Sequence, residues 1–102
     1  MAIRTKEDAA RALAGAQGEK RFFCVDGYVV KDLDQLAECL DHMTDDAYNY
    51  HVSSAKNDFH NWVSDVIADD KLARDLMKVA SRAEAAETVR ERVVWLKEKA
   101  TK

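Results

Sequence analysis

The fold is decided by one stretch of the chain, Asn57-Asp58-Phe59-His60-Asn61-Trp62-Val63-Ser64-Asp65-Val66-Ile67. Its large apolar residues recur at intervals of three and four, which places them on one face of a helix. They are Phe59, Trp62, Val63, Val66 and Ile67. Asparagine is a favoured N-cap residue, so we expect the helix to begin after Asn57. The stretch therefore predicts an amphipathic helix whose apolar face, including Trp62, belongs to a core.

Further helices are expected on both sides of this stretch, each beginning at a side chain that can cap it. The expected caps are Thr5, Asp32, Thr44 or Asp45, Asp69 or Asp70, and Ser81. The helix that follows Ser81 should run to about Ala100. The first helix is rich in alanine and should end at Gly15 or Gly18. It is expected either to dock on the core or to form a frayed arm.

A β-hairpin is expected between the first two helices. Residues 22–25 and 28–30 favour strands, and the Asp26-Gly27 dipeptide between them favours a two-residue turn. Because an isolated hairpin is marginal in water, helices must cover one of its faces. The expected fold class is mostly α, a compact bundle of four to six helices with one short β-hairpin near residues 22–31. We expect a single domain over residues 1–102, with an N-terminal helix or arm (1–18), a core (22–80) and a long C-terminal helix (81–100).

The composition indicates a folded, water-soluble chain. Of its 102 residues, 47% are hydrophobic and 34% are charged, which argues against disorder. No apolar run approaches the roughly 18 residues of a membrane span, and the first residues lack a signal-peptide pattern. The only cysteines, Cys24 and Cys39, cannot form a disulfide framework and are expected to be small core residues. These features favour the reducing environment of the cytoplasm.

The charges are distributed unevenly along the chain. Residues 32–70 carry ten acids and one base, whereas residues 71–102 carry nine bases and five acids. An acidic middle argues against a nucleic-acid platform, because such platforms need clustered Lys and Arg to neutralise phosphates. The simplest interpretation is that the acidic and basic segments are neighbours in the fold. A charge-guided partner site is the alternative.

The histidines do not have the spacing of a metal site. His42, His51 and His60 recur every nine residues, which would place neighbours on opposite sides of a continuous helix. The zinc-binding spacings of paired His or Cys residues are missing, and the acidic clusters lack the layout of a calcium loop. We therefore expect no metal and no cofactor.

His51 and Asp58 are the one pair that suggests catalysis. A histidine oriented by a carboxylate is a common general base, so the pair could form the centre of a ligand-binding or catalytic pocket. The alternative is that His51 connects a buried turn between two helices and serves the fold.

Three short motifs give the chain a family resemblance. They are Tyr48-x-x-His51, Asn57-Asp58-Phe59-x-x-Trp62 and Leu72-Ala73. With them, residues 22–80 resemble a small prokaryotic domain family of unknown function. The resemblance implies a compact domain that is sometimes appended to other proteins, with no established activity, substrate or cofactor. It also implies that His51, Asn57, Asp58 and Trp62 define the fold.

Trp95 is the residue that most suggests a partner. On a helical projection it lies nearly opposite the stripe formed by the apolar residues of the last helix, between Arg92 and Lys99. Trp and Arg are enriched in the energetic centres of interfaces, so Arg92, Trp95 and Lys99 could contact a partner protein or a second copy. Alternatively, the N-terminal helix covers Trp95 through Ala9 and Leu13.

The sequence thus favours a small, non-catalytic protein-interaction or regulatory domain. The first alternative is a ligand-binding or catalytic pocket at His51 and Asp58. The second is an RNA- or ribosome-associated factor that uses the basic segment 71–102.

Overall fold

The computed structural model describes all 102 residues, and most of them are helical. Its six α-helices are α1 (Lys6–Ala14), α2 (Leu33–His42), α3 (Asp45–His51), α4 (Asp58–Trp62), α5 (Asp70–Leu76) and α6 (Arg82–Ala100). A 3-10 turn, η1 (Gly18–Lys20), precedes strands β1 (Phe22–Phe23) and β2 (Val29–Val30), and a π-helical turn, η2 (Val63–Ile67), continues α4. The predicted fold class, a mostly α bundle of four to six helices with one short hairpin, is confirmed. None of the helices combines the length and apolar character needed to cross a bilayer.

Local capping explains where the helices begin. Five of them follow a side chain that accepts a hydrogen bond from the backbone N–H three residues later: Asp32, Thr44, Asn57, Asp69 and Ser81. At α1, Thr5 and Asp8 form a complete capping box. These are the expected positions, because a cap depends only on residues within one turn.

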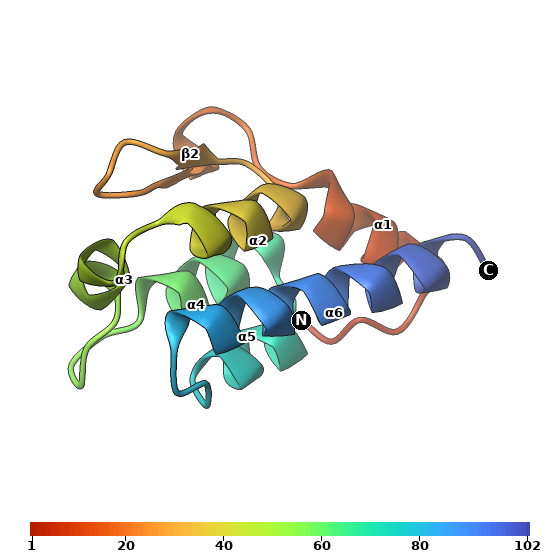
Figure 1. The fold of residues 1–102 in the computed structure, drawn as a ribbon. Helices are drawn as coiled ribbons and strands as arrows, with labels where there is room; N and C mark the ends of the chain where they lie inside the picture. The colour runs from red at the N-terminus through yellow and green to blue at the C-terminus, as the bar shows by residue number, and fades with distance from the viewer.

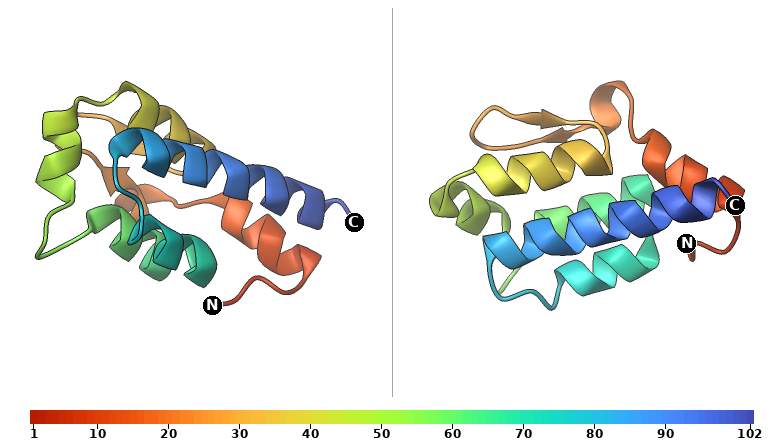
Figure 2. Two further views of the ribbon diagram at one scale, coloured as in Figure 1. Left: turned by 60° about the horizontal axis from the view of Figure 1, so that its bottom comes forward. Right: turned by 45° about the vertical axis from the view of Figure 1, so that its right-hand side comes forward.

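Helix α6 lies at the front of the molecule in Figure 1, between α2 and α5, with α1 against its C-terminal half (Figures 1 and 2). One face of α6 supplies buried residues to the core: Ala85, Ala86, Val89, Val93 and Leu96. The helix therefore joins elements from both ends of the chain into one core.

Helix α1 is docked on the core rather than frayed. Its Ala9 and Ala12 are fully buried, and α1 packs on α6. Such small side chains let two helix backbones approach closely. The helix ends at Gly15, whose φ is +79°, and a Cβ there would lie 2.3 Å from the carbonyl oxygen of Lys31. Glycine is therefore required where the chain leaving α1 crosses the end of β2.

The hairpin forms, but its turn differs from the prediction. Phe22 pairs with Val30 and Phe23 with Val29, and the N–H of Cys24 donates to the carbonyl of Tyr28 at 2.8 Å. Three residues, 25–27, therefore form the loop instead of the expected two. Gly27 has a φ of +100°, as is common for the last residue of a three-residue hairpin loop.

The stretch 57–67 is helical, but not as one uniform helix. Phe59, Trp62, Val63 and Ile67 are buried as expected, whereas Val66 is only partly buried. The reason is that the second half is a π-helical turn, which ends at Ala68 with a left-handed backbone (φ +64°). The wider turn changes the direction of the side chains that follow Trp62.

The acidic and basic segments are neighbours in the fold. This is the simplest interpretation of the charge pattern in the sequence. Along α6, Arg82 pairs with Asp45 at 3.0 Å, Lys97 pairs with Asp34 at 3.4 Å, and Arg90 pairs with Asp41. The partners lie on α2 and α3. Much of the charge of the two segments is therefore neutralised within the chain.

Candidate functional site

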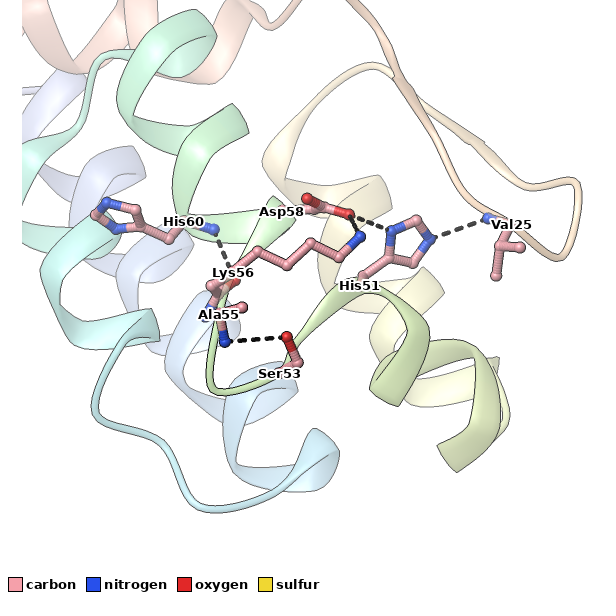
Figure 3. A network of polar contacts seen from close by, with 8 residues as sticks. Val25, His51, Ser53, Ala55, Lys56, Asp58 and His60 are labelled. Atoms are coloured by element: carbon pink, nitrogen blue, oxygen red, sulfur yellow. Dashed lines mark hydrogen bonds and ion pairs between the residues drawn. The ribbon is translucent and has the colours of Figure 1, made fainter.

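His51 is buried at the end of α3, and both of its ring nitrogens are engaged (Figure 3). Nε2 accepts a hydrogen bond from the backbone N–H of Val25 at 3.0 Å, in the hairpin loop. Nδ1 lies 2.9 Å from Oδ2 of Asp58, the first residue of α4. Because a backbone N–H can only donate, we assign the ring proton to Nδ1, which donates to Asp58.

This geometry connects three elements and leaves His51 without a free lone pair. A general base must present an unshared nitrogen to its substrate, whereas Nε2 here is occupied by the chain itself. Partial burial alone would raise the pKa of Asp58, but hydrogen bonds from His51 and from Lys56 (2.9 Å) lower it below the ordinary value. A depression of about 400 Å³, whose lining includes Val52 and Asn57, is lined by neither His51 nor Asp58. The arrangement is suited to holding the hairpin against the helices.

Asn57, another of the four residues that the family resemblance singles out, connects α4 to α5. Its Oδ1 accepts from the N–H of His60 at 3.0 Å, and its Nδ2 donates to the carbonyl of Leu76 at 3.2 Å. His60 adds a second connection, because its Nδ1 lies 2.7 Å from the carbonyl oxygen of Ala73.

Trp62 lies in an aromatic cluster between the hairpin and α4. Its Nε1 donates to the carbonyl of Lys20 at 2.8 Å, and its ring meets the ring of Phe22 edge-on. Phe22 in turn stacks on Phe59. The structure thus gives each of the four residues of the family resemblance a role in joining elements: His51, Asn57, Asp58 and Trp62.

The remaining chemistry-bearing residues form no cluster. No group of three or more His, Cys, Asp or Glu side chains is placed to hold a metal ion. Cys24 and Cys39 are free and buried, and burial raises the pKa of both thiols, that of Cys39 to about 12. Thiols of this kind are poor nucleophiles at neutral pH.

Trp95 presents a different environment, because its ring is half exposed yet held in place. Its exposed fraction is 41%, and the guanidinium carbon of Arg92 lies 4.2 Å from the ring centroid. The ammonium of Lys99 lies 5.9 Å from the same centroid. The expected trio of Arg92, Trp95 and Lys99 is therefore brought together.

Arg92, however, is not a free cation. Its Nε and Nη2 donate to the two carboxylate oxygens of Asp69 at 2.7 and 2.9 Å, and Asp69 has no exposed surface. Three of the five guanidinium N–H donors remain, but the Arg92 side chain is only 10% exposed. In the structure Arg92 supports Trp95, and its contact with a partner stays a prediction. From the sequence, Asp69 is expected only as a helix cap. No local pattern links residues 69 and 92, so this pair could not be found from the sequence.

Trp95 separates two depressions in the surface. The larger, about 520 Å³, runs along α6 beside α5 and includes Val79, Glu84 and Thr88 in its lining. The smaller, about 240 Å³, includes Ala2, Ile3 and Arg74. The alternative in which Ala9 and Leu13 cover Trp95 is therefore wrong, because the N-terminal residues beside the ring are Ala2 and Ile3 and the ring stays half exposed.

Comparison of the chain with protein-family models, with curated proteins and with solved structures finds no match in any of the three. The resemblance of residues 22–80 to a domain family therefore stays a prediction.

Proposed function

We propose that this chain is a small, non-catalytic protein-interaction domain whose binding surface is centred on Trp95. The observation that carries the proposal is the half-exposed indole ring held by Arg92, which is itself fixed by the buried carboxylate of Asp69. A rigid, exposed aromatic ring offers a large contact area and loses little conformational entropy on binding. Tryptophan is accordingly among the residues most often found at the energetic centre of an interface.

The catalytic alternative at His51 and Asp58 is less well supported. Both ring nitrogens of His51 have partners within the chain, and no depression includes the pair. A substrate would have to displace the N–H of Val25 before it could reach Nε2.

The RNA-binding alternative is also less well supported, because most of the basic segment is already paired. Of its nine bases, five have a carboxylate partner: Lys71, Arg82, Arg90, Arg92 and Lys97. Binding to a phosphate backbone depends on how many phosphates the protein can neutralise. The four remaining cations of the segment could neutralise only a few. We place the domain in the cytoplasm, where reducing conditions would keep Cys24 and Cys39 as thiols.

The experiment that tests this proposal compares two truncations on α6. Trp95→Ala removes the exposed ring, and Val94→Ala removes an exposed apolar side chain (56% exposed) from a neighbouring face. Both variants should stay folded, since an exposed cation–π contact contributes only about 0.5–1 kcal/mol. Purified wild-type and variant proteins are used to capture partners from a native lysate at low and high salt, and bound protein and nucleic acid are both measured.

We expect Trp95→Ala to lose the captured protein and Val94→Ala to retain it. If the two variants capture the same proteins as the wild type, the surface around Trp95 is not the binding site. Recovery of nucleic acid instead of protein, lost at high salt, would favour the RNA-binding alternative.

A further inference from the structure

The charges on the exposed face of α6 are not neutralised within the chain. Residues at intervals of three and four form this face, which we call the outer face: Glu84, Thr88, Glu91, Trp95 and Lys99. No acid lies within ion-pair distance of Lys99, whereas the other four cations of α6 each have an acidic partner. Glu84 and Glu91 likewise lack a basic partner. Apart from Glu98, the unpaired charges of α6 therefore all lie on its outer face.

These unpaired charges are separated by sign along the helix. Glu84 and Glu91 lie in the N-terminal part of the face, and Lys99 lies at its C-terminal end. The unpaired Arg74 of α5 lines the depression beside Trp95, at the basic end. Two residues oppose this trend, Lys78 near Glu84 and Glu98 next to Lys99, so the contrast is one of net charge. The outer face is acidic at one end, basic at the other, and has Trp95 between them.

We propose that the occupant of this surface is a second copy of the same chain, packed antiparallel along α6. This inference rests on the proposed function and names its partner. In a two-fold symmetric dimer, the same patch of each copy forms the interface. When the two patches are antiparallel, each end of one patch meets the opposite end of the other, so the two ends must be complementary. In the antiparallel arrangement, the acidic end of each outer face lies opposite the basic end of the other. Both contacts form at once.

The same rotation gives Trp95 a place to bind. The cleft along α6 extends from Glu84 to Trp95, about 16 Å at the rise of an α-helix, and is walled by Val79 and Thr88 at its acidic end. An antiparallel copy directs its own Trp95 toward that end of the cleft. The indole ring is pre-positioned by Arg92, and the charges around it determine the orientation of the copy.

We expect a reversible dimer that depends on salt. Each copy contributes one aromatic anchor and a rim of exposed charges, so we expect a weak interface with a dissociation constant on the order of 10–100 µM. Added salt screens exposed charge pairs and should shift the equilibrium toward monomer. Loss of the anchor in Trp95→Ala should raise the dissociation constant at least about tenfold.

Charge reversal provides the decisive test, measured by sedimentation equilibrium over a concentration series of the full chain. In Glu84→Lys, like charges meet at both ends of the dimer, and the same holds for Lys99→Glu. Each single variant should therefore be a monomer. An equimolar mixture of the two variants restores opposite charges at both contacts and should form a heterodimer. Lys97→Glu makes the same charge change on the far side of α6 and should dimerise like the wild type; circular dichroism checks that all variants are folded.

Two results would overturn the inference. One is a wild-type chain that stays monomeric across the concentration series; the other is a dimer that neither charge reversal weakens. A monomeric wild type that still captures another protein through Trp95 would exclude the second copy and leave the proposed function standing. A chain that neither dimerises nor captures a protein through Trp95 would contradict both.

Discussion

Replacing Asp69 by Asn should destabilise the protein far more than removing an exposed carboxylate does. Asparagine is as good an N-cap as aspartate, so the start of α5 should keep its cap on the N–H of Leu72. The substitution removes only the charge. The Arg92 side chain, 10% exposed, is then left without its anion in the contact between α5 and α6.

The size of the effect follows from this burial. Removing one partner of a buried ion pair typically costs about 3–5 kcal/mol, because the remaining charge is desolvated and uncompensated. The total stability of a domain of this size is on the order of 5–15 kcal/mol, so Asp69→Asn should remove a large part of it. The matched control is Asp41→Asn, which breaks the pair with Arg90. Both side chains of that pair are more than 40% exposed, and such pairs contribute about 1 kcal/mol or less.

The measurement is equilibrium unfolding in urea, followed by circular dichroism, for the wild type and both variants. We expect a large fall in the free energy of unfolding for Asp69→Asn and a small one for Asp41→Asn. A double variant, Asp69→Asn with Arg92→Leu, should recover part of the loss because it removes the uncompensated charge as well. Equal and small losses in the two single variants would refute the argument that Asp69 and Arg92 form a buried pair.

Three further outcomes follow from the structure. His51→Ala should lower the free energy of unfolding by about 1–3 kcal/mol in urea titrations, because Asp58 and the N–H of Val25 lose their partner; unchanged stability with loss of a bound ligand would favour the catalytic alternative. Trp62→Ala should cost about 3–5 kcal/mol and melt far below the wild type, and a native melting temperature would contradict its burial. Because the pKa of Asp58 is lowered in the fold, its carboxylate stabilises the protein above its ordinary pKa, and this contribution is lost as pH falls through the lowered value. Acid titrations of stability should therefore be less steep for Asp58→Asn than for the wild type.

The helix starts and the core faces could be predicted because they depend on residues close in sequence. Asn57 caps α4 through the N–H of His60, and Ser81 caps α6 through the N–H of Glu84. The apolar periodicity before and after these caps decides which face is buried. Such predictions need only the order of apolar and polar residues along a short segment of the sequence.

The features that sequence analysis missed depend on contacts between distant residues. The hairpin loop has three residues rather than two, and its Val25 N–H is bonded to His51, 26 residues away. The docking of α1 uses alanines, which leave no strong apolar signal in the sequence. Arg92 could be placed beside Trp95 by helical spacing, but its pairing with Asp69 arises from the packing of α6 against α5.

The packing of three helices on α6 has a consequence for the synthesis of this protein. Helices α1, α2 and α5 all pack on an element that the ribosome makes after them. At about 5–20 residues per second, the interval between completing α1 and beginning α6 lasts on the order of 3–15 s. During that time the apolar faces of α1, α2 and α5 that pack on α6 have no partner, although α4, α5 and the hairpin can already contact one another. We therefore expect the core to be completed only after α6 has left the ribosome, and a chain that stops before residue 82 to expose the surfaces that α6 covers.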